Sequence, residues 1–229
     1  MTYTEFSNQF DILYDNAISG APGVSEYEKS VFLTEAQEEY VKDNARLIEL
    51  DDRTRRILEP ITKPYYTATI DNNISNDNLG ITNSHLITIP SDTWMILQES
   101  ITNSGDVIKV EPIRHNNYNN IKENPFRRPN SRRVWRIEYS TTAGVSKVEL
   151  ITDDDTTITN YRNRYLIKPD PIITETLIGG LSIDGETATA TCILGNQIHR
   201  QILNRSIELA KSAYLGDLQT QVALNQRNK

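Results

Sequence analysis

Hydrophobic residues recur at helical spacing on both sides of a Gly-Ala-Pro-Gly turn near the start of the chain. Residues three and four apart share one face of a helix, so the first run predicts a short amphipathic helix. Its apolar stripe comprises Phe6, Phe10, Leu13 and Ala17. Thr2–Glu5 and Ser25–Glu28 both have the spacing of a capping box and predict where two helices begin. Between them, Gly20 can take the positive φ that ends a helix, and Pro22 prevents it from resuming.

The second helix of this hairpin is predicted to run from Glu26 to the mid-forties. Asp51 or Asp52 can then cap a further turn or two, which ends before Pro60. The residues expected to face inward are Tyr27, Val31, Ala36, Tyr40 and Leu47. Such a hairpin is either a docking element or an ordinary cap over a core. Because the short first helix is not stable alone, we expect its stripe to bury against the sheet domain or an adjacent subunit.

After Pro64 the pattern changes, because β-branched and aromatic residues in alternating or short apolar runs replace the helical stripe. The predicted strands are Tyr65–Ile70, His85–Ile89, Trp94–Ile101, Val107–Pro112, Val134–Tyr139, Val145–Ile151 and Thr157–Ile167. Ile70–Ser84 is predicted to be a polar loop, and Thr141–Gly144 a hairpin connection between two strands. Asn116–Asn130 is expected to hold one helical turn before its prolines make it irregular.

The last part of the chain begins with Lys168–Pro171, whose two prolines predict a stiff extended segment. The glycines between residues 179 and 185 are expected to shape turns around a short strand. Asn196 can cap a final helix, which Gly216 weakens and which frays from Gln219. The apolar residues of this helix are Ile198, Ile202, Ala210, Ala213 and Tyr214.

The order of these elements predicts an α+β fold with an N-terminal helical hairpin, a central antiparallel β-sheet region and a C-terminal helix. The expected domains are residues 1–60, residues 61–191 and residues 192–229, the last packing on the same core. No window approaches the roughly 18 consecutive apolar residues of a transmembrane helix. The N-terminus also lacks the basic and apolar runs of a signal peptide.

Charge is unevenly distributed along the chain. Residues 1–60 contain 13 acidic and 6 basic side chains, for a net charge of −7, whereas residues 61–229 contain 18 of each. Within the neutral part, seven basic residues and one acidic residue give residues 114–136 a net charge of +6. The seven are Arg114, Lys122, Arg127, Arg128, Arg132, Arg133 and Arg136. An acidic module and a basic segment on one chain can attract each other across copies.

The arginine patch, defined here as the arginines from Arg127 to Arg136, supports two interpretations. Phe126 and Trp135 interleave with it, and this composition can bind nucleic acid through phosphate contacts and stacking. Alternatively, the arginines pair with carboxylates on a neighbouring subunit or another protein. The chain's net charge of −7 argues against a dedicated nucleic-acid binder, so the pattern favours a protein interface.

The residue pattern predicts no catalytic site, no metal site and no cofactor. His85, His115 and His199 share no ligand spacing, and Asp153–Asp155 lacks the alternating oxygen ligands and glycine of a calcium-binding loop. Cys192 is the single cysteine and is expected to be a small buried hydrophobic residue. No serine or cysteine has the surroundings of a nucleophile, so an enzyme, such as a hydrolase, is the weakest class.

Several stretches of the chain carry a resemblance to one family. They are Phe10 to Gln37 (FDILYDNAIS and APGVSEYEKSVFLTEAQ), Ile89 to Ile101 (IPSDTWMILQESI), Val110 to Pro129 (VEPIRHNNYNNIKENPFRRP), Val134 to Tyr139 (VWRIEY), Arg164 to Thr174 (RYLIKPDPIIT) and Cys192 to Tyr214 (CILGNQIHRQILNRSIELAKSAY). In these motifs the sequence resembles the head–tail connector proteins, also called ring or adaptor proteins, of crAss-like phages, which infect gut Bacteroidota. The resemblance spans nearly the whole chain and departs from the family at Ile70–Ser84, an Asn-rich insert.

The resemblance implies a virion structural protein of the portal–tail connector in the virion neck, assembled in the host cytoplasm. Its subunits would form a closed homo-oligomeric ring of about twelve copies, matching the portal. The ring would extend the DNA channel and attach the tail, and packaged DNA would pass through it without sequence-specific contact. The implied partners are the portal protein and other connector and tail proteins, with no membrane contact. The alternative function is a nucleic-acid-binding accessory protein that acts through residues Arg127 to Arg136.

Eleven residues are expected to lie at interfaces between subunits or between ring layers. They are Phe6, Phe10, Leu13, Glu35, Glu38, Glu39, Phe126, Arg127, Arg128, Arg132 and Arg133. Together with Glu26 and Glu28, the glutamates of the helical region are expected to face the arginine patch of a neighbouring subunit. Asn124–Phe126 and Arg164–Pro171 are expected to be ordered despite their loop-like composition, as contact surfaces between ring layers.

Overall fold

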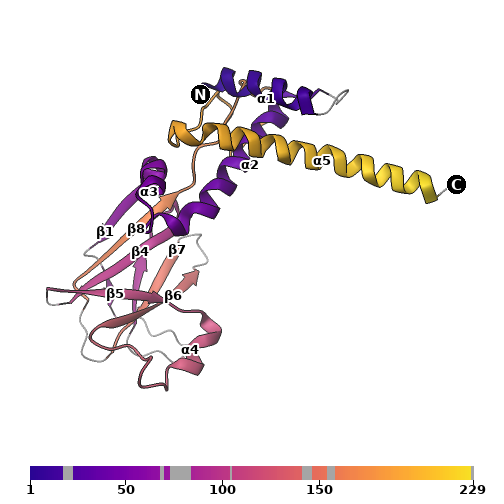
Figure 1. Ribbon diagram of the computed structural model, residues 1–229. Coiled ribbons are helices and arrows are strands. Elements are labelled where there is room, and N and C mark those ends of the chain that lie inside the picture. Colours follow the sequence, from indigo (N-terminus) through magenta and orange to yellow (C-terminus); the bar gives the residue numbers. More distant parts are fainter. Residues whose placement is uncertain are drawn as a thin grey trace. The chain divides into compact units, whose positions relative to one another are not determined.

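Both ends of the chain contribute to the same unit of the fold. A computed structural model describes residues 1–17, 23–67, 70–72, 84–103, 105–140, 146–153 and 158–227. Met1–Ile61 and Lys168–Lys229 make up the helical unit, and Thr62–Ile167 make up the sheet unit (Figure 1). The fold is mixed α+β, as expected. Residues 168–191, which the sequence groups with the strands, fall in the helical unit, and α2 forms hydrogen bonds with residues 170–174 of this segment, as described below.

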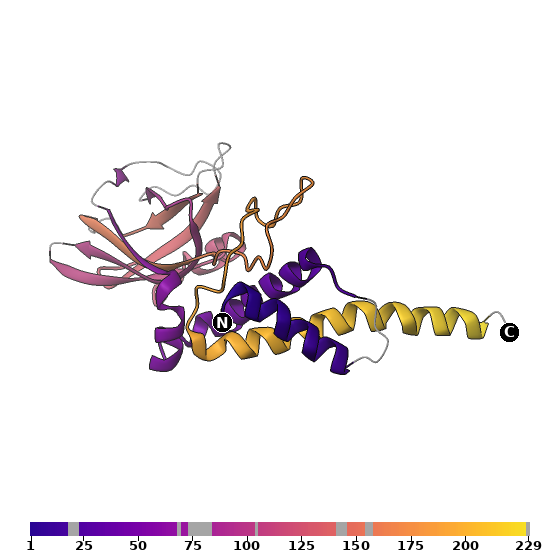
Figure 2. The same cartoon turned by 90° about the horizontal axis from the view of Figure 1, so that it is seen from above.

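The helical unit is built on α1 (Tyr3–Ala17), α2 (Glu26–Asn44) and α5 (His199–Arg227). Both α1 and α2 pack against α5 (Figure 2). The shorter elements are η1 (Ala45–Leu47), α3 (Asp52–Leu58), η2 (Glu59–Ile61) and η3 (Asn196–Ile198). The side chains that fill this core include Leu33, Ile57, Leu58, Ile61, Ile172, Ile198, Ile202 and Leu203, all buried. Burial of this shared apolar surface stabilises helices that would be marginal alone.

Both predicted capping boxes form. In the Thr2–Glu5 box, the backbone N–H of each residue donates to the side chain of the other, at 2.8 and 3.2 Å. The Ser25–Glu28 box is complete at the start of α2, and Asp51 caps α3 by accepting two backbone N–H groups. The turn expected at Gly20 and Pro22 lies outside the described residues.

The buried face of α2 is more polar than expected. Of the residues expected to face inward, Ala36 is buried, Tyr27, Val31 and Tyr40 are half-buried and Leu47, in η1, is exposed. Three polar side chains are buried on this face instead. They are Ser30, Thr34 and Gln37, and they form hydrogen bonds with residues 170–174. The inward face of α2 therefore combines buried apolar residues, such as Leu33 and Val41, with side chains that form hydrogen bonds.

The final helix is longer than expected. It begins with η3 at Asn196, as predicted, but α5 continues through Gly216 to Arg227 instead of fraying from Gln219. A single glycine costs about 1 kcal/mol in a helix interior, and the residues around it are mostly good helix formers. Its C-terminal part extends beyond the region where α1 and α2 lie against it (Figures 1 and 2).

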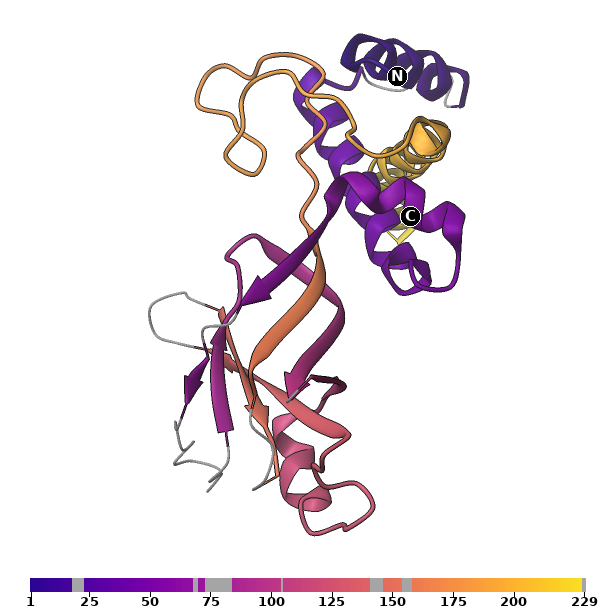
Figure 3. The same ribbon diagram turned by 90° about the vertical axis from the view of Figure 1, so that its left-hand side faces the viewer.

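Residues 173–190 form a folded-back segment, which we call the arm. Two isolated bridges pair Ile173 with Ala190 and Ile183 with Glu186, and the backbone N–H of Leu177 donates to Thr187 at 2.8 Å. The three glycines between residues 179 and 185 have positive φ and form turns, as expected, but isolated bridges take the place of the expected short strand. Figure 3 shows the arm as a looped segment beside α2.

The sheet unit contains an eight-stranded sheet among its described residues, in the order β1-β8-β4-β5-β6-β7-β3-β2. The strands are β1 (Thr62–Thr67), β2 (Asp71–Asn72), β3 (Ser84–Thr88), β4 (Thr93–Asn103), β5 (Asp106–Pro112), β6 (Arg133–Ser140), β7 (Ser146–Ile151) and β8 (Asn160–Ile167). Each of the seven predicted strands corresponds to one of these, whereas β2 lies in the stretch predicted as a loop. The hairpin connection expected at Thr141–Gly144 lies outside the described residues.

One strand pair departs from the expected antiparallel arrangement. β5 and β6 run parallel, with Lys109 opposite Arg133, whereas the other paired neighbours are antiparallel. The connection between them contains α4 (His115–Ile121), which returns the chain so that the start of β6 lies beside the second half of β5. A parallel pair requires such a crossover, because a tight turn reverses the chain direction.

The sheet curls around its own apolar core (Figure 3). The core includes Ile87, Ile101, Val110, Val134, Leu150 and Tyr161. A second, smaller cluster forms where Tyr118 of α4 packs edge-to-face against Trp135, with ring centroids 6.2 Å apart. This second cluster fixes α4 and the loop that follows it at one end of the sheet (Figure 3).

Candidate functional site

The arginine patch lies on the loop after α4 and on the beginning of β6. Arg127, Arg128 and Arg132 are exposed, and none of the three has a side-chain partner within the described part of the chain. Arg133 and Arg136 lie on β6 and are partly buried. The structure therefore divides the patch into three free cations on the loop and two arginines that the sheet unit itself uses.

Arg136 is used inside the sheet unit. Its guanidinium lies 3.2 Å from the Glu99 carboxylate, and only 11% of its side chain is exposed. The hydroxyl of Tyr161 donates to the same carboxylate. Burial raises the pKa of Glu99 above its ordinary value, while Arg136 and Tyr161 favour the ionised form. Arg136 therefore supports the fold and is not a surface contact.

The loop between α4 and β6 is held by hydrogen bonds within the sheet unit. The side chain of Asn124 accepts the backbone N–H of Phe126 at 3.0 Å, and its carbonyl accepts those of Arg127 and Arg128. Arg133 donates to the carbonyl of Phe126 at 3.0 Å and lies 3.5 Å from the Glu111 carboxylate. These hydrogen bonds hold Asn124–Phe126 within the subunit, and Phe126 is 87% exposed at this loop.

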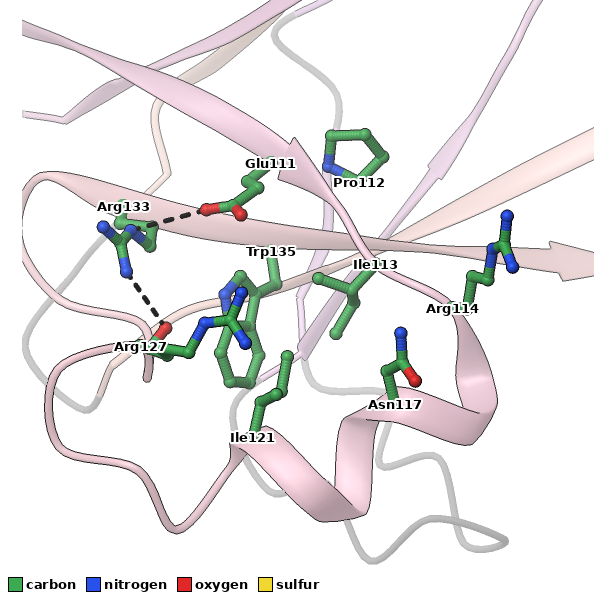
Figure 4. Close-up of a pocket in the computed structure, with 9 residues that line it drawn as sticks. All are labelled: Glu111, Pro112, Ile113, Arg114, Asn117, Ile121, Arg127, Arg133 and Trp135. Carbon is green, nitrogen blue, oxygen red and sulfur yellow. Dashed lines mark hydrogen bonds and ion pairs between the residues drawn. The ribbon is translucent and has the colours of Figure 1, made fainter.

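A pocket of about 220 Å³ lies between this loop, α4 and the end of β5 (Figure 4). It is lined by Glu111, Pro112, Ile113, Arg114, Asn117, Ile121, Arg127, Arg133 and Trp135. Figure 4 shows Trp135, Ile113 and Ile121 on its apolar side, with the arginines around them. Arg114 and Arg127 have no carboxylate partner among the described residues, so the pocket favours an acidic side chain or another small anion.

The glutamates expected to face the arginine patch mostly have partners within their own unit. Glu26 pairs with Lys29 at 2.6 Å, and Glu28 completes the α2 cap. Glu38 lies 2.9 Å from Lys168, and Glu39 lies 2.7 Å from Arg205. Of these glutamates, Glu35 alone is exposed and without a partner in the described chain. The acidic surface of α2 is therefore weaker than its sequence predicts.

The aromatic stripe of α1 lies in the core of the helical unit. Phe6 and Phe10 are fully buried, and Leu13 is half-buried. The Phe6 ring lies 5.4 Å from the His199 ring, and the Phe10 ring stacks 5.9 Å from that of Tyr14. The expectation that Phe6 and Phe10 meet the sheet domain or an adjacent subunit is therefore corrected, because they pack α1 within the helical unit.

The other expected contact segment, Arg164–Pro171, is divided between two roles. Residues up to Ile167 form the end of β8, paired with β1 and β4. Lys168 forms ion pairs with Glu38 and Asp184, and Gln37 donates to the Asp170 carbonyl at 2.8 Å. Contacts within the chain therefore hold this segment, and its role between ring layers stays a prediction.

The structure also reveals a surface that the sequence did not predict. Ile178 and Leu181 of the arm are 81% and 44% exposed, beside a pocket of about 520 Å³. We call it the arm pocket; it is lined by Tyr3, Glu26, Tyr27, Thr174, Glu175, Thr176, Leu177, Ile178, Leu181 and Thr189. Apolar residues flank Gly179-Gly180 in the sequence, but their spacing does not show that they lie together at a surface. The backbone pairing along the arm brings them there.

The residues considered for chemistry occupy structural positions. Cys192 is buried, as expected, and burial raises the pKa of its thiol to about 11. His199 is buried and His85 half-buried, and burial lowers both pKa values, whereas exposed His115 donates to the Glu138 carbonyl at 2.7 Å. Most of the run Asp153–Asp155 lies outside the described residues. No helix in the described chain combines the length and apolarity needed to cross a membrane.

Comparison with known proteins relates nearly the whole chain to phage ring proteins. Residues 1–221 match the family model described as phage tail ring protein 3/4. The chain is 36% identical to "Ring protein 4/5" of Bacteroides phage crAss001 over 239 aligned residues, which cover 100% of both chains. It is 34% identical to "Ring protein 3" of the same phage, over 92% of this chain and 95% of that protein.

Proposed function

Because the chain belongs to the phage tail ring protein 3/4 family and is a virion structural ring protein of the crAss-like phage type, we propose that it forms one ring of the portal–tail connector. In this proposal the ring extends the DNA channel and joins the capsid portal to the tail in the virion neck. The observation that carries it is similarity to a ring protein over the full length of both chains.

A closed ring of identical subunits needs two different complementary surfaces on each subunit, because each copy contacts its neighbours head to tail. The sheet unit offers Arg127, Arg128 and Arg132 as unpaired cations on an ordered loop. The helical unit offers exposed carboxylates such as Glu35 and Glu175, which have no partner among the described residues. These opposite charges, carried by different units, support a head-to-tail contact between copies.

In this proposal the ring holds about twelve copies, the number that would match a portal of twelvefold symmetry. The chain's net charge of −7 suits a channel through which DNA slides, because acidic surfaces repel phosphates. In this account the portal and other connector and tail proteins contact the ring above and below. Subunits assemble in the host cytoplasm, and the protein has no catalytic activity.

A nucleic-acid-binding accessory role is the second candidate, because Phe126 is exposed beside the unpaired Arg127 and Arg128. An exposed aromatic ring beside free guanidinium groups can stack on bases while the arginines contact phosphates. The ring role is favoured, because the chain's net negative charge weakens nucleic-acid binding.

Native mass spectrometry of the full chain across protein and salt concentrations tests the ring proposal. We expect closed oligomers of a single copy number, which dissociate as the salt concentration rises because exposed ion pairs are screened. A chain that stays monomeric at every concentration and binds duplex DNA with a steep salt dependence would instead support the accessory role.

A further inference from the structure

Phe126 is an exposed aromatic side chain on a loop that the sheet unit holds in position. It is 87% exposed, and its backbone is bound on both sides, by the Asn124 side chain at 3.0 Å and by Arg133 at 3.0 Å. A loop that is already ordered loses little conformational entropy when it docks. Aromatic residues that become buried when two proteins bind are among the side chains that most often dominate the binding energy. Phe126 is therefore presented as an anchor for a partner.

The arm pocket of the helical unit is a suitable receptor for an aromatic ring. Its volume is about 520 Å³, whereas a cavity of about 150 Å³ already accommodates benzene. Tyr27, Leu177, Ile178 and Leu181 supply apolar surface to its lining, and Ile178 is 81% exposed. Burying this surface with a phenyl ring would remove apolar area from water on both partners.

The charges beside the two surfaces are complementary. Glu175 lines the arm pocket, is exposed and has no partner within the described residues. Arg127 and Arg128 directly follow Phe126 and are equally unpaired. Exposed ion pairs contribute only about 0–1 kcal/mol each, so these charges would orient the contact while the apolar surface supplies affinity.

We propose that Phe126 of one subunit inserts into the arm pocket of the adjacent copy, with Arg127 and Arg128 facing Glu175. The proposal rests on the ring function, because it names a contact by which one copy holds the next. The anchor lies on the sheet unit and the receptor on the helical unit, so the contact is heterologous, as a ring requires. A second copy fits better than DNA, because a pocket bordered by unpaired Glu175 repels phosphates.

Disulfide trapping between two separately tagged populations of the full chain tests this contact. One population carries Phe126→Cys and the other Ile178→Cys, and the mixture is oxidised and analysed for the heterodimer. Native Cys192 does not compete, because it is buried and its thiol pKa is raised to about 11. The matched control replaces Phe126→Cys with Val107→Cys, since Val107 is an apolar residue of the same unit that is 69% exposed.

We expect the Phe126→Cys and Ile178→Cys pair to form a heterodimer in large excess over the control pair. In addition, Phe126→Ala should weaken association by roughly 30-fold or more while leaving thermal stability unchanged, because the side chain is exposed in the subunit. Equal heterodimer yields in the two pairs would overturn the proposed contact. If wild-type chain still forms closed oligomers in that case, the ring function stands, whereas a strictly monomeric wild-type chain counts against the ring itself.

Loss of duplex-DNA binding in Phe126→Ala, with unchanged association, would also overturn the proposal and would assign Phe126 to nucleic acid. Glu175→Arg provides the complementary arm of the test. It should weaken association of the wild-type chain, and combining it with Arg127→Glu and Arg128→Glu should restore part of the loss. Failure of the combined variant to recover any association would show that these charges do not face each other.

Discussion

The hydroxyl oxygen of Ser30 accepts a hydrogen bond from the backbone N–H of Thr174 at 3.0 Å, inside the core of the helical unit. One turn further along α2, the Thr34 hydroxyl accepts the backbone N–H of Ile172 at 3.1 Å, and Gln37 binds the Asp170 carbonyl. Polar side chains of α2 thus satisfy backbone groups on one edge of this extended segment, whereas Ile173 pairs with Ala190 on the other. Buried backbone groups left without such partners would destabilise the fold.

Replacing Thr34 with valine tests these hydrogen bonds with almost no change in shape. Thr34→Val should lower the free energy of unfolding by about 1–3 kcal/mol, because the buried N–H of Ile172 loses its acceptor. Chemical denaturation of the full chain measures the change. Thr34→Ser keeps the hydroxyl and serves as the control, with a smaller loss expected. Equal stability of wild type and Thr34→Val would contradict the role of the hydrogen bond.

Truncation of the α1 stripe tests whether its aromatic residues pack inside the helical unit. Phe10→Ala should lower the free energy of unfolding by about 3–5 kcal/mol, since the ring is fully buried beside Tyr14. Ile12→Ala on the same helix is the control. Ile12 is 60% exposed, so its loss should stay within about 0.5 kcal/mol. Similar, small losses in both variants would mean that α1 does not pack as described.

The buried ion pair of the sheet unit predicts a pH-dependent defect. Burial raises the pKa of Glu99 above its ordinary value of 4.5, and Arg136 opposes this by favouring the ionised carboxyl, so removal of Arg136 should raise the pKa further. In Arg136→Met the unfolded chain releases the Glu99 proton above pH 4.5 more readily than the folded chain does. The stability loss should therefore be small near pH 4 and grow to about 3–5 kcal/mol at neutral pH.

Urea denaturation of Arg136→Met at a series of pH values measures this slope. Arg133→Met is the matched control on the same strand. Arg133 pairs with the half-exposed Glu111 at 3.5 Å, so its loss should cost about 1 kcal/mol or less, with little dependence on pH. A stability difference between wild type and Arg136→Met that stays constant from pH 4 to pH 8 would show that Arg136 does not affect the ionisation of Glu99.

Charge reversal on the loop separates the two candidate functions. Arg128→Glu combined with Arg132→Glu should impair assembly more than it impairs binding of duplex DNA, because these unpaired cations are proposed to meet carboxylates of another copy. Lys109→Glu combined with Lys147→Glu makes the same change in net charge on strands of the same unit. Native mass spectrometry and DNA binding are compared for both. Normal assembly of the loop variant, with weakened DNA binding, would assign the patch to nucleic acid.

The local pattern of residues predicted most of the elements. The seven strands followed from alternating apolar residues, and both capping boxes followed from a hydroxyl residue and a glutamate three positions apart. The local pattern does not show which residues that are distant in sequence become neighbours in the fold. The inward face of α2 was misassigned because Ser30 and Thr34 become core residues only when residues 170–174 lie against them.

The candidate site shows the same division. Exposure of Arg127, Arg128 and Arg132 followed from a charged, proline-flanked loop. The ion pair between Arg136 and Glu99 could not be predicted in this way, because Glu99 lies on a strand that is far from Arg136 in sequence. Neutralisation of Glu38 and Glu39 likewise depends on Lys168 and Arg205, which the fold brings from the other end of the chain. Such pairings are decided by topology, which residue spacing alone does not specify.

The central claim, that this chain forms a connector ring, is tested most directly by a symmetric reconstruction of virion necks at side-chain resolution. We expect a ring of about twelve copies coaxial with the portal. In this ring, the loop bearing Phe126 and Arg128 of one copy should contact the helical unit of the next. We also expect no base-specific contact with DNA in the channel. Absence of the chain from the neck, or its presence there as single copies along DNA, would contradict the account.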